Sequence, residues 1–265
     1  MKVSGKGFIC KGLASGLPYN SAPLITLAVD TTSPGGSAAV LRDDRIIGSV
    51  STWTEETYSS RMFRQVDFLL EELSLALEHV DLFAVANGPG SFTGLRVGIA
   101  ATKAWAEAYG KPVVGVSALE AIAAQSRAAS PVLVPAFDAR RGEVYFCFYR
   151  REGGSPEQEL VLAGEYSVMP PADFLNEVRT RLGDTGTAFT IVTPTPEALS
   201  AALGQWNAGI EGRKGITLDV VPNILALAIG LLAARRARSG TTDNSLTLEA
   251  NYVRRTDAEL KWKGL

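Results

Sequence analysis

Residues 24–30 read Leu-Ile-Thr-Leu-Ala-Val-Asp, an apolar run of strand length that ends in a carboxylate. The turn-forming sequence Thr-Thr-Ser-Pro-Gly-Gly follows at 31–36 and ends the strand. Two further strands are expected at 37–41 and 46–52, because runs of strand-forming residues flank a polar turn at 42–45. The chain therefore opens with three strands in succession.

Helices and strands alternate through the rest of the first half. Apolar residues at helical spacing predict helices at 59–78, 95–109 and 117–129, and short apolar runs predict strands at 82–87 and 113–116. Three strands followed by helix, strand, helix, strand and helix indicate an α/β fold, in which helices cover a mixed sheet.

The second half opens in the same way as the first. Residues 132–138 (Val-Leu-Val-Pro-Ala-Phe-Asp) are again an apolar strand that ends in Asp, with a turn at 139–142 and a strand at 143–150. Asp138 follows Asp30 by 108 positions (138 − 30). Strands often end in Asp by chance. The succession is nevertheless the one expected of a duplicated βββαβα unit, as in the actin and sugar-kinase superfamily.

This repeat predicts a division of the chain into two lobes. The first would span 24–130, and the second would span 131–265 as a reduced copy with a C-terminal helix and tail. Residues 1–23 lack a continuous apolar stretch of signal-peptide length and are expected to form a disordered extension. In the second lobe we expect strands near 159–168 and 188–193, and helices at 171–182, 196–203 and 222–238.

Composition excludes several classes of function. The 265 residues carry a formal net charge of −2, so there is no overall basic field for nucleic acid. His79 is the single histidine, which rules out a two-histidine zinc motif. The two cysteines, Cys10 and Cys147, form no disulfide framework and fit a reducing, cytoplasmic setting. No apolar run approaches the roughly 20 residues that a membrane-spanning helix needs.

A glycine-rich loop at 87–96, Asn-Gly-Pro-Gly-Ser-Phe-Thr-Gly-Leu-Arg, joins a predicted strand to a predicted helix. Glycines allow close backbone approach, and the free N–H groups of a helix start attract anions. The spacing matches neither a P-loop nor the Gly-x-Gly-x-x-Gly fingerprint. A tight turn without a ligand is an equally good explanation. If the loop does hold a nucleotide or phosphate, the candidate residues are Asp30, Gly88, Gly90, Ser91, Thr93 and Gly94.

Three segments resemble a known family, TsaB (also called YeaZ). They are Gly-Pro-Gly-Ser-Phe-Thr-Gly-Leu-Arg at 88–96, Ala-Val-Asp-Thr-Thr at 28–32, and Asn-Tyr-Val-Arg-Arg-Thr-Asp-Ala-Glu at 251–259. The family belongs to tRNA threonylcarbamoyladenosine (t6A) biosynthesis and is also known as a glycoprotease-like, peptidase M22 homologue. The resemblance covers about residues 24–263. It implies two duplicated βββαβα lobes of the actin-like (ASKHA, ribonuclease H-like) fold, the second one reduced.

The resemblance further implies a scaffold role without catalysis. The catalytic paralogue, TsaD, binds a metal through a His-x-x-x-His motif that the lone His79 cannot supply. Where relatives usually carry His-Ser before the long helix, this chain has Tyr58-Ser59. The implied function is to dock and activate TsaD in the t6A complex. No cofactor is implied for this chain, since ATP and Mg²⁺ would be bound by partner subunits.

The resemblance also implies which partners bind the chain and which of its helices contact them. The partners are TsaD and the ATPase TsaE, with a homodimer when the chain is alone. Contact with tRNA would come only through the complex, since phosphate binding needs clustered Lys and Arg. The helices at 59–78 and 95–109 are expected to provide the docking surface.

A helical wheel suggests which side chains face the partner. In the first helix, Phe68 and Leu75 lie opposite the core face, to which we assign Phe63. In the second, Ile99 and Ala106 lie opposite an inner stripe made of Val97, Ala101, Ala104, Trp105 and Ala108. We therefore expect Phe68, Leu75, Ile99 and Ala106 at the centre of the interface, with Arg64 and Lys103 at its rim. Scattered exposed apolar residues are the plainer explanation.

Two other functions remain open. An actin-fold ATP-binding enzyme acting on its own would place a hydrated Mg²⁺ near Asp30 and phosphates on residues 88–94, although 138–142 is a weak match to a second phosphate loop. A peptidase is disfavoured, because serine catalysis generally needs a base and no motif surrounds His79.

Overall fold

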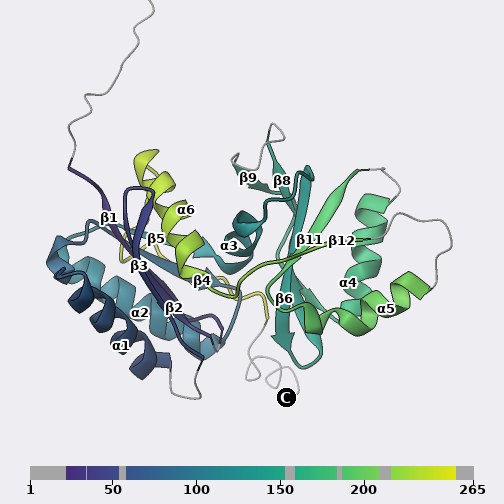
Figure 1. Cartoon of the computed structure of the whole chain (residues 1–265), viewed down its shortest axis with the longest axis horizontal. Helices are drawn as coiled ribbons and strands as arrows, with labels where there is room; N and C mark the ends of the chain where they lie inside the picture. Colours follow the sequence, from purple (N-terminus) through teal and green to yellow (C-terminus); the bar gives the residue numbers. More distant parts are fainter. Residues whose placement is uncertain are drawn as a thin grey trace, which may run out of the picture.

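The computed structural model describes residues 22–33, 35–53, 58–152, 159–183, 187–208 and 216–254. Most of the predicted N-terminal extension, Cys10, and the C-terminal motif beyond Arg254 lie outside these ranges. The described chain forms two sheets with helices on their faces (Figure 1).

The first sheet confirms the three opening strands. Its spatial order is β3-β2-β1-β4-β5. β1 runs antiparallel to β2 and parallel to β4, and β5 runs parallel to β4. The strands are β1 (Ile25–Asp30), β2 (Ser37–Arg42), β3 (Arg45–Ser51), β4 (Leu82–Gly88) and β5 (Val113–Ser117).

The second sheet repeats this order. Its main path is β10-β7-β6-β11-β12, in which β6 is antiparallel to β7 and parallel to β11. β8 and β9 pair off this path. The same three antiparallel strands followed by two parallel ones therefore occur twice, which is the duplicated, actin-like arrangement. The strands are β6 (Val132–Arg140), β7 (Glu143–Phe146), β8 (Tyr149–Arg151), β9 (Leu160–Leu162), β10 (Ser167–Met169), β11 (Phe189–Thr193) and β12 (Thr217–Val220).

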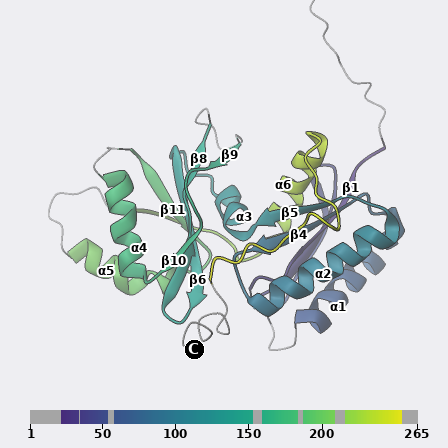
Figure 2. The ribbon, with the colours of Figure 1, turned by 180° about the vertical axis from the view of Figure 1, so that it is seen from behind.

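Helices cover both faces of each sheet (Figures 1 and 2). α1 and α2 cover one face of the first sheet, against Leu27 and Val29 of β1. α4 and α5 cover the outer face of the second sheet, and α3 lies between the lobes. The helices are α1 (Tyr58–Glu72), α2 (Phe92–Tyr109), α3 (Ala118–Gln125), α4 (Pro171–Val178), α5 (Ser200–Ala208) and α6 (Ala226–Arg238). Short helical turns occur at Leu77–His79, Arg179–Gly183 and Pro196–Ala198.

The last helix, α6, lies on the first sheet, although the sequence prediction placed it in the second lobe. Ala28 of β1 and Ile229 of α6 share one buried cluster. A Cβ at Gly230 would come within 2.2 Å of Leu41 Cδ1, so this glycine permits close contact between helix and sheet. The chain thus returns from the second lobe to the first.

The first predicted helix is shorter than expected. α1 ends at Glu72, and the predicted continuation to 78 is wrong. Ser74 takes a left-handed backbone (φ 49°), and the Leu75 N–H donates to Leu70 O at 2.9 Å. This is a helix-ending conformation that usually falls on glycine, and here a serine occupies it. The sequence therefore gave no sign of the stop.

Candidate functional site

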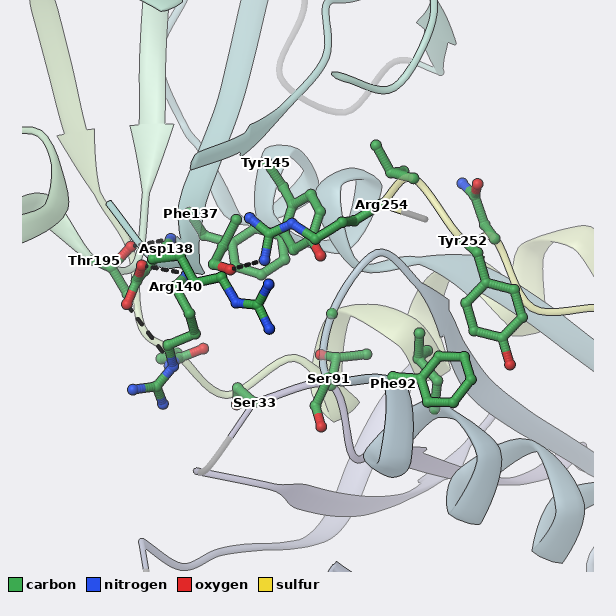
Figure 3. A pocket seen from close by; sticks show the side chains of 18 of the residues that line it. Ser33, Ser91, Phe92, Phe137, Asp138, Arg140, Tyr145, Thr195, Tyr252 and Arg254 are labelled. Atoms are coloured by element: carbon green, nitrogen blue, oxygen red, sulfur yellow. Dashed lines mark hydrogen bonds and ion pairs between the residues drawn. The ribbon is translucent and has the colours of Figure 1, made fainter. Parts of the chain in front are cut away.

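The glycine loop connects β4 to α2 and lies against the turn after β1 (Figure 3). Ser91 caps α2, because its Oγ accepts a hydrogen bond from Gly94 N at 3.2 Å. The Ser91 N–H donates to Thr32 O at 2.9 Å. Thr31 Oγ1 donates to Gly94 O at 2.7 Å. The loop and the β1–β2 turn therefore form one interlocked unit.

Close chain packing accounts for the glycines of this loop. A Cβ at Gly94 would lie 1.9 Å from Thr31 O, and one at Gly90 would lie 2.5 Å from Thr32 Cβ. Gly88 has φ 118°, and a Cβ there would lie 2.5 Å from Asn251 O. The predicted residues Asp30, Gly88, Gly90, Ser91, Thr93 and Gly94 thus lie in one region. Their glycines meet protein atoms, and a phosphate-binding role stays a prediction.

The carboxylate of Asp30 is buried beneath this turn, with a relative exposure of 1%. Its Oδ1 accepts hydrogen bonds from Thr32 N at 2.8 Å and from Thr32 Oγ1 at 2.6 Å. Within the described residues Oδ2 has no hydrogen-bond partner. Burial raises the pKa of Asp30, and its bonds to Thr32 and the charge of Arg61 oppose that rise. The ionised form is therefore costly here.

A cleft of about 780 Å³ separates the two lobes. Figure 3 shows the first-lobe residues Ser33, Ser91 and Phe92 on one side and the hairpin between β6 and β7 on the other. The cleft lies within the size range of ligand pockets in proteins. The side chains that line it include Thr32, Trp53, Tyr58, Asp138, Arg140, Arg141, Tyr145, Glu197, Tyr252 and Arg254.

The C-terminal segment bridges this cleft. The Asn251 N–H donates to Asn87 O at 2.7 Å, and the Tyr252 ring lies 5.1 Å from the Phe92 ring. Arg254 reaches the second lobe, where it donates to Ala139 O at 2.8 Å and pairs with Glu143. The sequence motif at 251–254 was recognised, but nothing in the sequence indicated that it joins the lobes.

Two arginines occupy the tip of the second-lobe hairpin. Arg140 and Arg141 have φ of 63° and 59°, in the left-handed region that glycine and asparagine favour. Asp138 Oδ1 accepts a hydrogen bond from Arg140 N at 2.7 Å and supports the turn. In the sequence, residues 138–142 were only a weak match to a phosphate loop, and no signal there predicted two cations at the cleft.

The expected partner residues do not form a single face. Phe68 is 52% exposed and Arg64 is exposed, as predicted. Ile99 and Ala106, at 8% and 3%, face the core, so their placement on the outer face is wrong. Lys103 is half-buried on α2. Leu75 lies beyond the end of α1, half-buried against the core of the first lobe.

The error in α2 has a clear cause. A Cβ at Gly94 would approach within 1.9 Å of Thr31 O, and one at Gly98 within 2.4 Å of Thr31 Oγ1. These two glycines therefore mark the buried side of the helix. The wheel counted Val and Trp together with alanines and ignored the glycines, and so it assigned the stripe to the wrong side. The inner-stripe assignment of Ala104 and Ala108 is therefore wrong, since both are exposed.

The observed outer face of α1 and α2 is apolar at its centre. Phe63 is 44% exposed, which corrects its assignment to the core, and its ring meets the half-buried Trp105 ring edge-on at 6.0 Å. Beside them, the exposed Ala100, Ala104 and Ala108 follow one another at four-residue spacing along α2. Together with Phe68, these residues define what we call the docking face.

No group of three or more His, Cys, Asp or Glu side chains in the described part of the chain is placed to hold a metal ion. No described helix is both long enough and apolar enough to cross a membrane. His79 is exposed at the end of a short helical turn, 3.9 Å from Glu78.

Comparison with known proteins identifies relatives of the chain. The family model described as "TsaD: tRNA N6-adenosine threonylcarbamoyltransferase" matches residues 44–176, which is half of the chain. A Bacillus subtilis protein named tRNA threonylcarbamoyladenosine biosynthesis protein TsaB is 34% identical over 152 residues, covering 56% of this chain and 66% of that protein. The protein of the same name from Haemophilus influenzae is 36% identical, covering 49% and 55%. These alignments thus span between about half and just under two thirds of the relatives.

Solved structures agree with these sequence matches. YeaZ from Pseudomonas aeruginosa superimposes with a TM-score of 0.66 at 25% identity, covering 86% of this chain and 99% of that one. A second Pseudomonas aeruginosa structure, described as similar to peptidase YEAZ, gives a TM-score of 0.67 at 25% identity, covering 87% and 100%. Given the duplicated sheet order, the glycine loop and these matches, the chain belongs to the TsaB (YeaZ) family of TsaD-related proteins.

Proposed function

We propose that this chain is a non-catalytic subunit of the t6A modification machinery and that it holds a TsaD-type catalytic partner on its docking face. The names of the curated relatives, which refer to t6A biosynthesis, support the pathway. The observation that carries the docking role is the exposed apolar centre formed by Phe63, Phe68 and the alanines of α2.

The shape of this face suits a helical partner. Alanines at four-residue spacing let a second helix approach closely, and neighbouring aromatic rings provide apolar area to bury. Charged residues lie beside them, with Arg64 on α1 and Lys103 on α2. An apolar centre with a polar rim is the usual anatomy of a protein–protein interface. The same face would form a homodimer when the partner is absent.

The proposal of a scaffold rather than an enzyme rests on the surroundings of two polar side chains, Asp30 and His79. Asp30 is buried and hydrogen-bonded to its own turn. His79 is exposed, with Glu78 as its nearest described acidic neighbour. Neither arrangement resembles a nucleophile paired with a base. We further propose that ATP and Mg²⁺ bind partner subunits, among them a TsaE-type ATPase, that the complex carries the tRNA, and that it works in the cytoplasm.

The cleft supports one alternative function, that of an ATP-binding enzyme acting alone. Its volume of about 780 Å³ would admit a nucleotide. Calorimetry of the isolated chain with Mg-ATP separates the two functions. The scaffold proposal expects no nucleotide turnover by the chain alone, and turnover would overturn it.

Co-purification with a TsaD-type partner tests the docking role. Ala104→Arg places a long charged side chain at the centre of the face, and we expect it to weaken the complex at least thirtyfold, since central anchors often contribute about 2 kcal/mol or more. Val220→Asp is the matched control, because Val220 is 56% exposed on β12 of the other lobe. Equal binding by the two variants would refute the proposed face.

A further inference from the structure

We propose that the rim of the inter-lobe cleft binds an unpaired RNA segment, with bases stacked on exposed aromatic rings of the first lobe and phosphates held by arginines of the second. The inference rests on the proposed function, because a tRNA-modifying assembly must hold RNA. It names a contact that this chain itself would contribute to that assembly.

Three exposed aromatic rings line this cleft, although they are far apart in the sequence. Trp53 is 71% exposed after β3, Phe92 is 36% exposed at the start of α2, and Tyr252 is 46% exposed in the C-terminal segment. All three line the cleft. Exposed aromatic rings are the usual stacking surfaces for unpaired bases, which are recognised largely through their flat faces.

Neighbouring groups hold these rings in place. A Cβ at Gly35 would lie 2.9 Å from Trp53 Cε3, so the indole packs directly on the β1–β2 turn. The Arg96 guanidinium lies 3.9 Å from the Phe92 ring centroid, and its Nε donates to Tyr252 Oη at 3.3 Å. Rings fixed in this way lose little freedom when a base stacks on them.

The opposite rim carries the hairpin arginines (Figure 3). Two consecutive non-glycine residues in the left-handed region cost roughly 1 kcal/mol or more each, and such conformations concentrate at functional sites. The carboxylate nearest to Arg140, Asp138 Oδ2, is 4.0 Å from its Nε, and the Arg140 side chain is 67% exposed. Arg141 is exposed as well. Exposed guanidinium groups match the geometry of phosphate oxygens.

Flat rings on one side and cations on the other fit a nucleotide unit, a planar base next to a phosphate. Trp53 and the Phe92–Tyr252 pair, whose rings lie 5.1 Å apart, together offer more ring surface than one base would use, which favours a strand over a free nucleotide. Glu197 is an exposed carboxylate in the same lining, and its charge opposes a phosphate. Asp138 is a second carboxylate in this lining, so the site combines three exposed rings and the two hairpin arginines with two carboxylates that should weaken it.

Fluorescence anisotropy of a labelled single-stranded oligoribonucleotide, titrated with the full chain, tests this site. Asparagine tolerates the left-handed backbone, so Arg140→Asn with Arg141→Asn removes both charges and keeps the turn. We expect this variant to weaken binding at least tenfold and to reduce the log–log salt slope by about 1.4, the value for two phosphates on a single strand. Arg140→Lys with Arg141→Lys should keep most of the slope, and Glu197→Gln should tighten binding.

The stacking half of the proposal has its own variants. Trp53→Ala and Tyr252→Ala should each weaken binding about 5- to 150-fold, the range for loss of one stacked base. Tyr109→Ala and Arg150→Asn are matched controls, because both residues are exposed and neither lines the cleft. Melting temperatures must stay near the wild-type value for each comparison to count.

Four outcomes would overturn the proposal. These are no binding to wild type, equal loss in the control variants, equal competition by a duplex of the same length, and equal competition by AMP or Mg-ATP. The last result would assign the cleft to a free nucleotide. Partner co-purification keeps the two proposals apart, because the Asn/Asn variant should still bind the TsaD-type partner and Ala104→Arg should still bind RNA.

Discussion

Arg254→Ala should loosen the connection between the two lobes. Arg254 lies two residues after the Tyr252 contact with the first lobe, and it donates to Ala139 O while pairing with Glu143. Its guanidinium also lies 5.6 Å from the Tyr145 ring centroid. Truncation to alanine removes all three interactions between the tail and the second-lobe hairpin.

The size of the effect follows from the burial of the pair. The Arg254 and Glu143 side chains are 21% and 33% exposed, so the ion pair is partly screened and contributes less than a buried one. With the charged hydrogen bond to Ala139 O, we expect a loss of about 1–2 kcal/mol in unfolding free energy. For a chain of this size that corresponds to a fall in Tm of about 2–6 °C.

Thermal unfolding and hydrogen exchange together measure this effect. Exchange should rise at 87–92 and 139–143, the two segments that the tail joins. Arg238→Ala is the control, because Arg238 pairs with Asp44 on the surface of the first lobe and should cost no more than about 0.5 kcal/mol. The reversed pair, Arg254→Glu with Glu143→Arg, should recover part of the loss. A Tm unchanged within 1 °C, roughly the resolution of the assay, together with unchanged exchange, would refute the bridging role.

Two further predictions concern the glycine loop and the buried carboxylate. Gly94→Ala should lower the unfolding free energy by roughly 3 kcal/mol, because its Cβ would overlap Thr31 O. Gly204→Ala in α5 should be neutral or stabilising, because nothing lies within 4 Å of its Cβ. Equal urea midpoints for the two variants would contradict the packing argument. Burial raises the pKa of Asp30 above its ordinary value of 3.8, so the folded state binds the proton more tightly and the contribution of Asp30 to stability falls as pH rises through and above that value. Between pH 4 and pH 8, the unfolding free energy of wild type should therefore fall relative to that of Asp30→Asn as pH rises. A rise of the wild-type value relative to the variant would contradict the raised pKa.

The duplicated sheets could be predicted because each begins with an unmistakable strand. Residues 25–30 and 132–138 are apolar runs that end in Asp at the same point of the repeat, and the structure pairs both in the same order. The packing of α6 on the first sheet could not be predicted from such a pattern. An alanine-rich helix fits either sheet, and only the close approach of Gly230 to Leu41 shows where it lies.

The exposure of the residues expected on the proposed docking face was predicted only in part. Phe68 is where the wheel placed it, whereas Ile99 and Ala106 face the core. The buried side of α2 is set by contacts between Gly94, Gly98 and Thr31, which join residues more than 60 positions apart. A helical wheel contains no such contacts, and without them the glycines did not mark the buried side.

The residues at the cleft rim could not be predicted from the sequence for a similar reason. Trp53, Phe92 and Tyr252 belong to three separate segments, and no local pattern links them. The left-handed backbone of Arg140 and Arg141 is likewise a property of the hairpin, because the residue types themselves favour other conformations. Only Asp138 and Gly142 hinted at a tight turn there.

The most direct test of the docking role is hydrogen exchange of the full chain, alone and with its TsaD-type partner. Protection on binding should concentrate in α1 and α2, residues 58–72 and 92–109, with the second lobe unchanged. Protection confined to the second-lobe segments 171–183 and 200–208, with α1 and α2 exchanging as in the free chain, would contradict the account.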